Sequence, residues 1–122
     1  MFELLVKLDF DAAHRLVEYK GKCENLHGHN WKVDITVAAE NVDKEGMVKD
    51  FKTIKEMSNV VINQLDHKYL NEIEFFKKVN PTSENIAKYI FDNLIDAFKK
   101  ESIMLKKVSV WETDTACASY YR

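Results

Sequence analysis

Residues 27–37, HGHNWKVDITV, hold the pattern that decides the fold of this chain. Every second residue of the later part is apolar: Trp31, Val33, Ile35 and Val37. Polar residues fill the positions between them, which predicts a strand with one buried and one polar face. His27 and His29 precede this run at the same spacing of two. If the strand begins there, both imidazoles point to one side of it, and Gly28 lets the backbone bend between them.

The segment before this strand carries the same alternation. Its apolar positions are Phe2, Leu4, Val6, Leu8 and Phe10, and Leu5 is the one break in the pattern. It therefore predicts another half-buried strand. Residues 11–29 join the two strands as a long connection that holds three of the four histidines and one of the two cysteines. A connection this long within a compact domain usually carries function.

Two helices are predicted after the second strand. Asp50 can cap the first, which ends near Asp66-His67; its apolar positions are Phe51, Ile54, Met57, Val61 and Leu65. The sequence NPTSE at residues 80–84 starts the second, where Thr82 or Ser83 caps. Its buried stripe is Ala87, Ile90, Phe91, Leu94 and Phe98.

Two further strands are predicted near the end of the chain, at residues 108–112 and 118–122. The order β-β-α-α-β-β predicts one α+β domain over residues 1–122, a four-stranded antiparallel sheet covered by two helices on one face. So small a sheet leaves open edges, and pairing of edges between subunits is one remedy. We therefore expect a homo-oligomer.

Composition excludes several classes of function. The net charge is −2 and the pI about 6.1, so no global basic field favours nucleic acid. The apolar stretches are too short to span a bilayer, and residues 1–9 carry acids where a signal peptide needs an apolar core. A cytoplasmic location is the expectation. A Gly-rich dinucleotide loop and a Walker A motif are both absent from the sequence, which argues against bound-NAD(P) redox chemistry and kinase activity.

Three histidines suit a divalent metal, most plausibly Zn²⁺: His14, His27 and His29. Catalytic zinc takes three protein ligands and keeps one position open, and a neutral imidazole is a standard ligand. Cys23, flanked by Lys20 and Lys22, would have its thiolate favoured near a dication and can then act as a base or nucleophile. The alternatives for Cys23 are a small, partly buried apolar residue or a fourth zinc ligand.

The remaining candidate residues each have a structural alternative. Asp66 can fix the tautomer of His67, although neighbours in sequence often point apart and the pair can simply end a helix. Glu112 can take the paired N–H donors of a guanidine-like heterocycle, or it can be a solvated strand end. Thr82 and Ser83 can donate to the same ligand, although capping already explains them.

Six segments in order resemble the 6-pyruvoyltetrahydropterin synthase/6-carboxytetrahydropterin synthase family over nearly the whole chain. They are FDAAHRL (10–16), KCENLHGHN (22–30), GMVKDF (46–51), LDHKYLN (65–71), NPTSEN (80–85) and WET (111–113). The resemblance implies the tunnelling fold, whose subunits join into trimeric barrels that stack into a homohexamer. It implies zinc at the three histidines, and a catalytic set of Cys23, Asp66 and His67 with the last two contributed by a neighbouring subunit. Glu112 would anchor the pterin, helped by Thr82 and Ser83.

The spacing from Cys23 to His27 resembles the 6-carboxytetrahydropterin branch, which serves queuosine biosynthesis. That branch implies conversion of 7,8-dihydroneopterin triphosphate to 6-carboxytetrahydropterin, acetaldehyde and triphosphate. The 6-pyruvoyl-forming enzymes typically carry two more residues in this interval. A third branch, which makes 6-hydroxymethyldihydropterin for folate, places a glutamate in this loop, as Glu24 does here. A rival from another class is a zinc-stabilised oligomeric binding module without catalysis.

Overall fold

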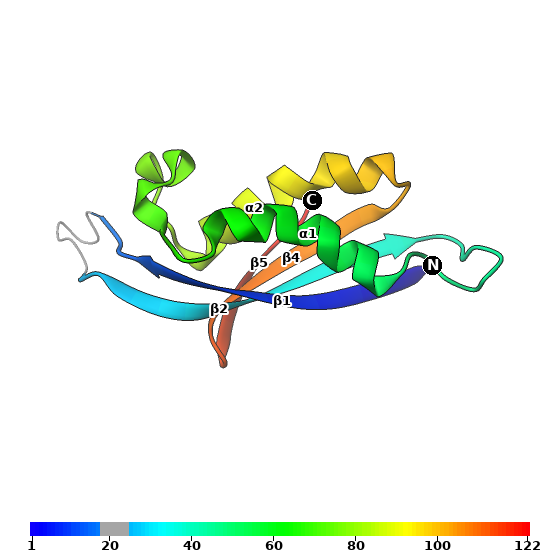
Figure 1. The fold of residues 1–122 in the computed structure, drawn as a ribbon, viewed down its shortest axis with the longest axis horizontal. Coiled ribbons are helices and arrows are strands. Elements are labelled where there is room, and N and C mark those ends of the chain that lie inside the picture. Colours follow the sequence, from blue (N-terminus) through cyan, green and yellow to red (C-terminus); the bar gives the residue numbers. More distant parts are fainter. Residues whose placement is uncertain (18–24) are drawn as a thin grey trace.

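One twisted sheet carries both helices on the same face, and the opposite face is left open (Figure 1). The structure is a computed structural model that describes residues 1–17 and 25–122. Its elements are β1 (Phe2–His14), β2 (His27–Ala39), α1 (Phe51–Leu65), β3 (Lys68–Tyr69), two 3₁₀ turns η1 (Leu70–Glu72) and η2 (Glu74–Lys77), α2 (Ser83–Lys100), β4 (Met104–Thr113) and β5 (Ala116–Tyr120). Among the described residues, no helix is long and apolar enough to cross a membrane.

The two N-terminal strands are longer than predicted. They pair in antiparallel register from Phe2 opposite Ala39 to His14 opposite His27. The prediction that all of residues 11–29 form a connection is therefore wrong, because His14 ends β1 and His27 begins β2. The ladder continues through polar residues because backbone pairing does not need the apolar alternation by which a strand is recognised in sequence.

The sheet has five strands in the order β3-β1-β2-β4-β5, not the predicted four. The added strand, β3, is parallel to β1 and pairs Lys68 with Ala12. His67 directs the chain there: its φ is +56°, and its N–H donates to the Asp11 carbonyl at 2.6 Å. Two residues are too few to show a period, which explains why the sequence pattern missed β3.

Both helices begin at the predicted caps. The Asp50 side chain accepts from the Lys52 N–H at 2.8 Å, and Thr82 Oγ1 accepts from the Asn85 N–H at 3.1 Å. α1 packs on β1, and α2 packs on β4 and β5. One residue of the predicted stripe of α1 is not in the core, because Phe51, the first residue of the helix, is 56% exposed.

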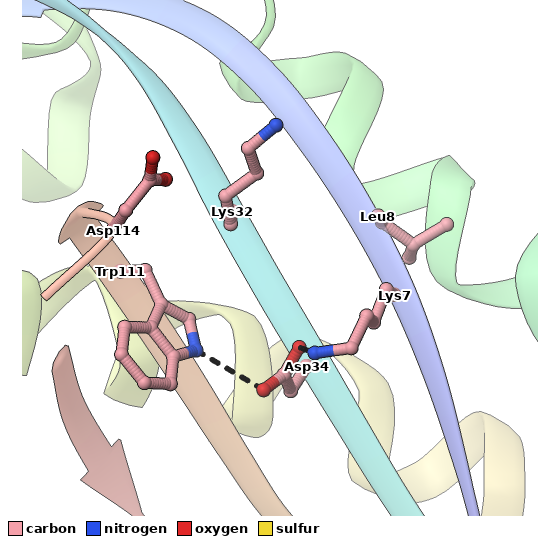
Figure 2. A pocket seen from close by; sticks show the side chains of 6 residues that line it. All are labelled: Lys7, Leu8, Lys32, Asp34, Trp111 and Asp114. Carbon is pink, nitrogen blue, oxygen red and sulfur yellow. Dashed lines mark hydrogen bonds and ion pairs between the residues drawn. The ribbon is translucent and has the colours of Figure 1, made fainter.

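The core lies between the helices and the sheet. Its largest fully buried side chains include Phe10, Trp31, Ile35, Ile90, Phe91, Leu94 and Phe98. On the open face a carboxylate is also buried: Asp34 accepts from Lys7 Nζ at 3.1 Å and from Trp111 Nε1 at 3.0 Å. Figure 2 shows these three residues in a pocket of about 270 Å³. Because the Asp34 carboxylate keeps two donors, it can be buried on a sheet face at low cost.

Candidate metal centre

Four potential metal ligands converge at one end of the sheet, on the side that faces the helices. They are His14 from β1, His27 and His29 from β2, and Glu112 from β4. One donor atom from each lies within 4.8 Å of the others. The register explains the convergence of the histidines, since directly opposite residues such as His14 and His27 project to the same face. His29 follows two residues later and so shares that face.

The spacing of the donor atoms suits a small cation. His14 Nε2 lies 3.1 Å from His27 Nε2 and 3.2 Å from Glu112 Oε1. His29 Nε2 lies 3.7 Å from the same carboxylate oxygen. Tetrahedral zinc, with bonds to nitrogen of about 2.0–2.1 Å, holds its donors about 3.3 Å apart. The printed distances bracket that value.

The tautomers of two histidines also favour a cation. His14 Nδ1 donates to the Pro81 carbonyl at 2.8 Å, and His27 Nδ1 donates to the Asn25 carbonyl at 2.9 Å. Because a carbonyl only accepts, both protons sit on Nδ1, and each neutral ring then presents a lone pair at Nε2. A hydrogen bond between the two Nε2 atoms would require an imidazolium. Burial, the largest influence, lowers the pKa of His14 and so favours its neutral form.

His29 supplies a further sign of a missing partner. Its Nε2 atom is buried and has no hydrogen-bond partner among the described residues. Buried polar atoms are seldom left unsatisfied, because their desolvation costs free energy that nothing returns. Three imidazole nitrogens and a carboxylate oxygen form a donor set that fits zinc. The residues present therefore fit a bound divalent metal.

Asp66 and His67 are brought into contact at the end of α1. His67 Nδ1 lies 3.0 Å from Asp66 Oδ2, and Asp66 Oδ1 accepts from the Asp11 N–H at 2.9 Å. That backbone N–H is the first cause, and the contact with His67 a further one, of a lowered pKa for the Asp66 carboxyl. The positive φ of His67 overcomes the tendency of sequence neighbours to point apart. The ring is thus held through Nδ1, while its side chain is 78% exposed.

This dyad shares a surface hollow with the metal centre. The hollow has a volume of about 440 Å³, and both His29 and His67 line it, together with Asp11, Gly28, Asn30 and Lys68. Asn30 Nδ2 donates to Asp11 Oδ1 at 2.9 Å, which joins β2 to the residue that holds Asp66. A ligand in this hollow can therefore reach a metal ligand and the exposed dyad.

Comparison with known proteins identifies the family. The family model described as 6-pyruvoyl tetrahydropterin synthase matches residues 3–122. The chain belongs to the 6-pyruvoyl tetrahydropterin synthase family. A 6-carboxy-5,6,7,8-tetrahydropterin synthase of Synechocystis is 37% identical over 126 residues, which cover 99% of this chain and 94% of that protein. A 6-pyruvoyl tetrahydrobiopterin synthase of Drosophila melanogaster is 38% identical over 125 residues, which cover 91% and 74%.

A solved structure gives the same result for the fold of this synthase family member. The Caenorhabditis elegans 6-pyruvoyl tetrahydropterin synthase superposes with a TM-score of 0.87 at 33% identity, covering 99% of this chain and 95% of that one. The prediction of an α+β tunnelling fold with two helices on one sheet face is confirmed. The family resemblance recognised in the sequence is confirmed as well.

The other predicted site residues lie differently. Thr82 caps α2 and Ser83 is its first residue, directly after the Pro81 carbonyl that holds His14. The start of α2 is therefore part of the surroundings of the metal centre. Cys23 lies outside the described residues, so its predicted role has no structural counterpart. Glu112 is placed with the histidines, a position that its predicted role as a pterin anchor did not anticipate.

Two asparagines are supporting residues that sequence reasoning missed. Asn71 donates to the Arg15 carbonyl at 2.9 Å and accepts from its N–H at 3.0 Å. Asn80 makes the same pair of bonds with Val17, at 3.1 and 2.7 Å. These amides replace the strand partner that the backbone loses after His14. The sequence offered one signal, since both asparagines lie within the segments that carry the family resemblance.

Proposed function

We propose that this family member is a zinc-dependent lyase that makes 6-carboxy-5,6,7,8-tetrahydropterin. The substrate would be 7,8-dihydroneopterin triphosphate, the other products acetaldehyde and triphosphate, and the pathway queuosine biosynthesis. One observation carries the chemistry: lone pairs of buried imidazoles converge with a carboxylate on one point. The Synechocystis relative, named as a 6-carboxy-5,6,7,8-tetrahydropterin synthase, supports this choice of product.

The proposed mechanism divides proton transfer between two groups. Zinc held by His14, His27 and His29 would supply Lewis acidity to a substrate hydroxyl and to the neighbouring C–H bonds. His67 moves a proton at Nε2, because its Nδ1–H is engaged by the ionised Asp66. Cys23, as a thiolate, takes a proton on the other face of the substrate. Electrons pass from the side chain to the ring by tautomerisation, so a nicotinamide is not required.

Substrate binding is assigned to Glu112 and to the start of α2. A carboxylate accepts two parallel N–H donors well, and the pterin ring offers such a pair. Thr82 and Ser83 lie beside the carbonyl that holds His14, so polar groups there can bind the same ring. We include all three residues in the substrate site of the proposal.

We infer a homohexamer built from two trimeric rings. In the described part of the sheet, β3 pairs with Ala12 and Ala13 alone, which leaves the rest of the β1 edge open to another strand. β5 forms the opposite edge. Pairing β1 of one subunit with β5 of the next would remove both edges. The Asp66–His67 dyad lies at the β1 edge, where it would face a neighbouring subunit.

The test is incubation of the zinc-loaded protein with 7,8-dihydroneopterin triphosphate, with products identified by mass spectrometry. 6-Carboxytetrahydropterin with acetaldehyde would support the proposal. A 6-pyruvoyl product, the activity named for the Drosophila relative, would overturn the subfamily and keep the family. A 6-hydroxymethyl product would point to Glu24 as the acting group in the loop.

A zinc-stabilised binding module is the alternative without catalysis. Metal removal separates the two, because an enzyme would stay assembled and become inactive. A module would dissociate or unfold when it loses the ion, as structural zinc sites do. Sedimentation of the chelated protein measures the difference.

A further inference from the structure

We propose that Glu112 is a fourth, exchangeable ligand, which closes the metal centre in the substrate-free protein and is the ligand that substrate replaces. This inference rests on the zinc site of the proposed function. It adds a role to Glu112 that binding of the pterin ring does not require. The two roles are compatible if the carboxylate leaves the metal when the substrate arrives.

The first argument is electrostatic. Glu112 Oε1 lies 3.2 Å from His14 Nε2 and 3.7 Å from His29 Nε2. His14 presents a lone pair there, because its proton is on the Nδ1 atom that donates to Pro81. A carboxylate oxygen and a lone pair at that distance repel each other unless a cation lies between them. The position of Glu112 is thus the position of a ligand.

The second argument concerns which ligand can leave. His14 and His27 are fixed through Nδ1 by backbone carbonyls, and the His14 side chain is only 2% exposed. The Glu112 side chain is 39% exposed, against 22% for His29. A catalytic zinc site must provide one position for water or substrate. Glu112 holds that position because it is the most accessible of these three measured donors.

The third argument concerns how β4 presents this carboxylate. The register between β4 and β5 shifts between Trp111 and Thr113, so Glu112 occupies an irregularity of the strand. Trp111 projects to the open face, where its indole donates to Asp34 (Figure 2). Bulges commonly re-aim a side chain next to an active site. This bond fixes the strand beside Glu112 and leaves the carboxylate itself free to move.

The test measures zinc affinity without substrate, by competition with a chromogenic chelator. Glu112→Ala is compared with wild type and with Asp114→Asn, which removes an exposed carboxylate two residues away that is outside the donor cluster. We expect Glu112→Ala to weaken zinc binding about 10- to 100-fold, and Asp114→Asn to leave it unchanged. Added acetate should restore the affinity of Glu112→Ala, because it supplies the missing carboxylate.

The outcomes distinguish this inference from the proposed function. Wild type that binds no zinc would overturn the metal site and the proposed function together. Equal affinity in wild type and Glu112→Ala would overturn the ligand role of Glu112 and leave the function standing. Weakened binding that acetate does not restore would also overturn it, because Glu112 would then act through folding. Circular dichroism checks that the variant is folded.

Exchange is tested with cobalt(II) in place of zinc in Glu112→Ala, using neopterin, whose side chain carries a vicinal diol. Acetate should alter the visible spectrum of the bound cobalt. Saturating neopterin should then give one spectrum whether acetate is present or not, because the diol takes the same position. A difference due to acetate that persists at saturation would overturn the exchange.

Discussion

At the scale of residues, two backbone carbonyls decide what the metal centre can do. Pro81 and Asn25 take the Nδ1 protons of His14 and His27, so both Nε2 atoms are ready to bind a cation without first losing a proton. Such partners orient metal ligands and fix their tautomers. Sequence spacing identified the ligands, but it could not identify these carbonyls, because a backbone acceptor has no signature in a side-chain pattern.

We expect His27→Ala to lose zinc and activity together. The substitution removes one of three imidazole ligands, and the remaining lone pairs then hold the ion at least about 100-fold less tightly. Metal content by mass spectrometry and turnover are measured on the same sample. Activity that persists without bound metal would disprove the role of this site.

Cys23→Ala should retain zinc and the fold but lose turnover, because the thiolate is proposed as a base and not as a ligand. We expect kcat to fall by about 100-fold or more. Zinc content and circular dichroism provide the controls. Loss of zinc in this variant would instead assign Cys23 as a ligand, which the three-histidine assignment excludes.

Asp66→Asn should make stability less dependent on pH. The pKa of Asp66 is lowered below 3.8, chiefly by the Asp11 N–H. The carboxylate therefore contributes stability fully above its unfolded-state pKa and loses that contribution as pH falls through the lower folded-state value. Below about pH 4, metal-free wild type should lose more stability than metal-free Asp66→Asn, which thermal melts measure. An identical pH dependence in the two proteins would contradict this.

At the scale of elements, the interiors of helices and strands follow from the sequence, and their ends do not. Asp50 and Thr82 cap the helices as predicted, because an oxygen before an apolar stripe is a local signal. The ends of β1 and β2 lie among polar residues, so the alternation stops before the strands do. β3 depends on the backbone conformation of His67, which a long-range bond to Asp11 fixes.

α1 contains a buried hydroxyl that should reduce stability. Ser58 is fully buried, and its Oγ has no hydrogen-bond partner in the described part of the chain. Ser58→Ala should raise the free energy of unfolding by about 1 kcal/mol, because it removes an unsatisfied polar group and improves helix propensity. Urea denaturation measures it.

The matched control for Ser58 is Ser109→Ala. Ser109 is also buried, but its Oγ lies 2.6 Å from Ser119 Oγ and so is hydrogen bonded. We expect this variant to lose about 1 kcal/mol of stability. If Ser58→Ala destabilised the protein as much as Ser109→Ala does, Ser58 Oγ would have to be hydrogen bonded in solution.

At the scale of the whole molecule, the sheet and the site raise the same question. The β1 edge is open beyond Ala12, and the dyad lies beside that edge with His67 mostly exposed. Hydrophobic periodicity predicts which face of the sheet is buried, but it carries no information on which copy of the chain completes an edge. The predicted hexamer therefore stays a prediction, although the fold leaves its edges available for it.

Complementation tests whether neighbouring subunits share a site. His27→Ala and His67→Ala are each expected to be inactive, the first without metal and the second with it. Co-expression under two affinity tags yields mixed oligomers. If zinc and the dyad come from different subunits, random mixing at equal amounts gives about one quarter of the sites both intact parts, and about that share of wild-type activity returns. If each subunit builds its own site, every site in the mixture lacks one part, and the mixed oligomers stay as inactive as the two parents.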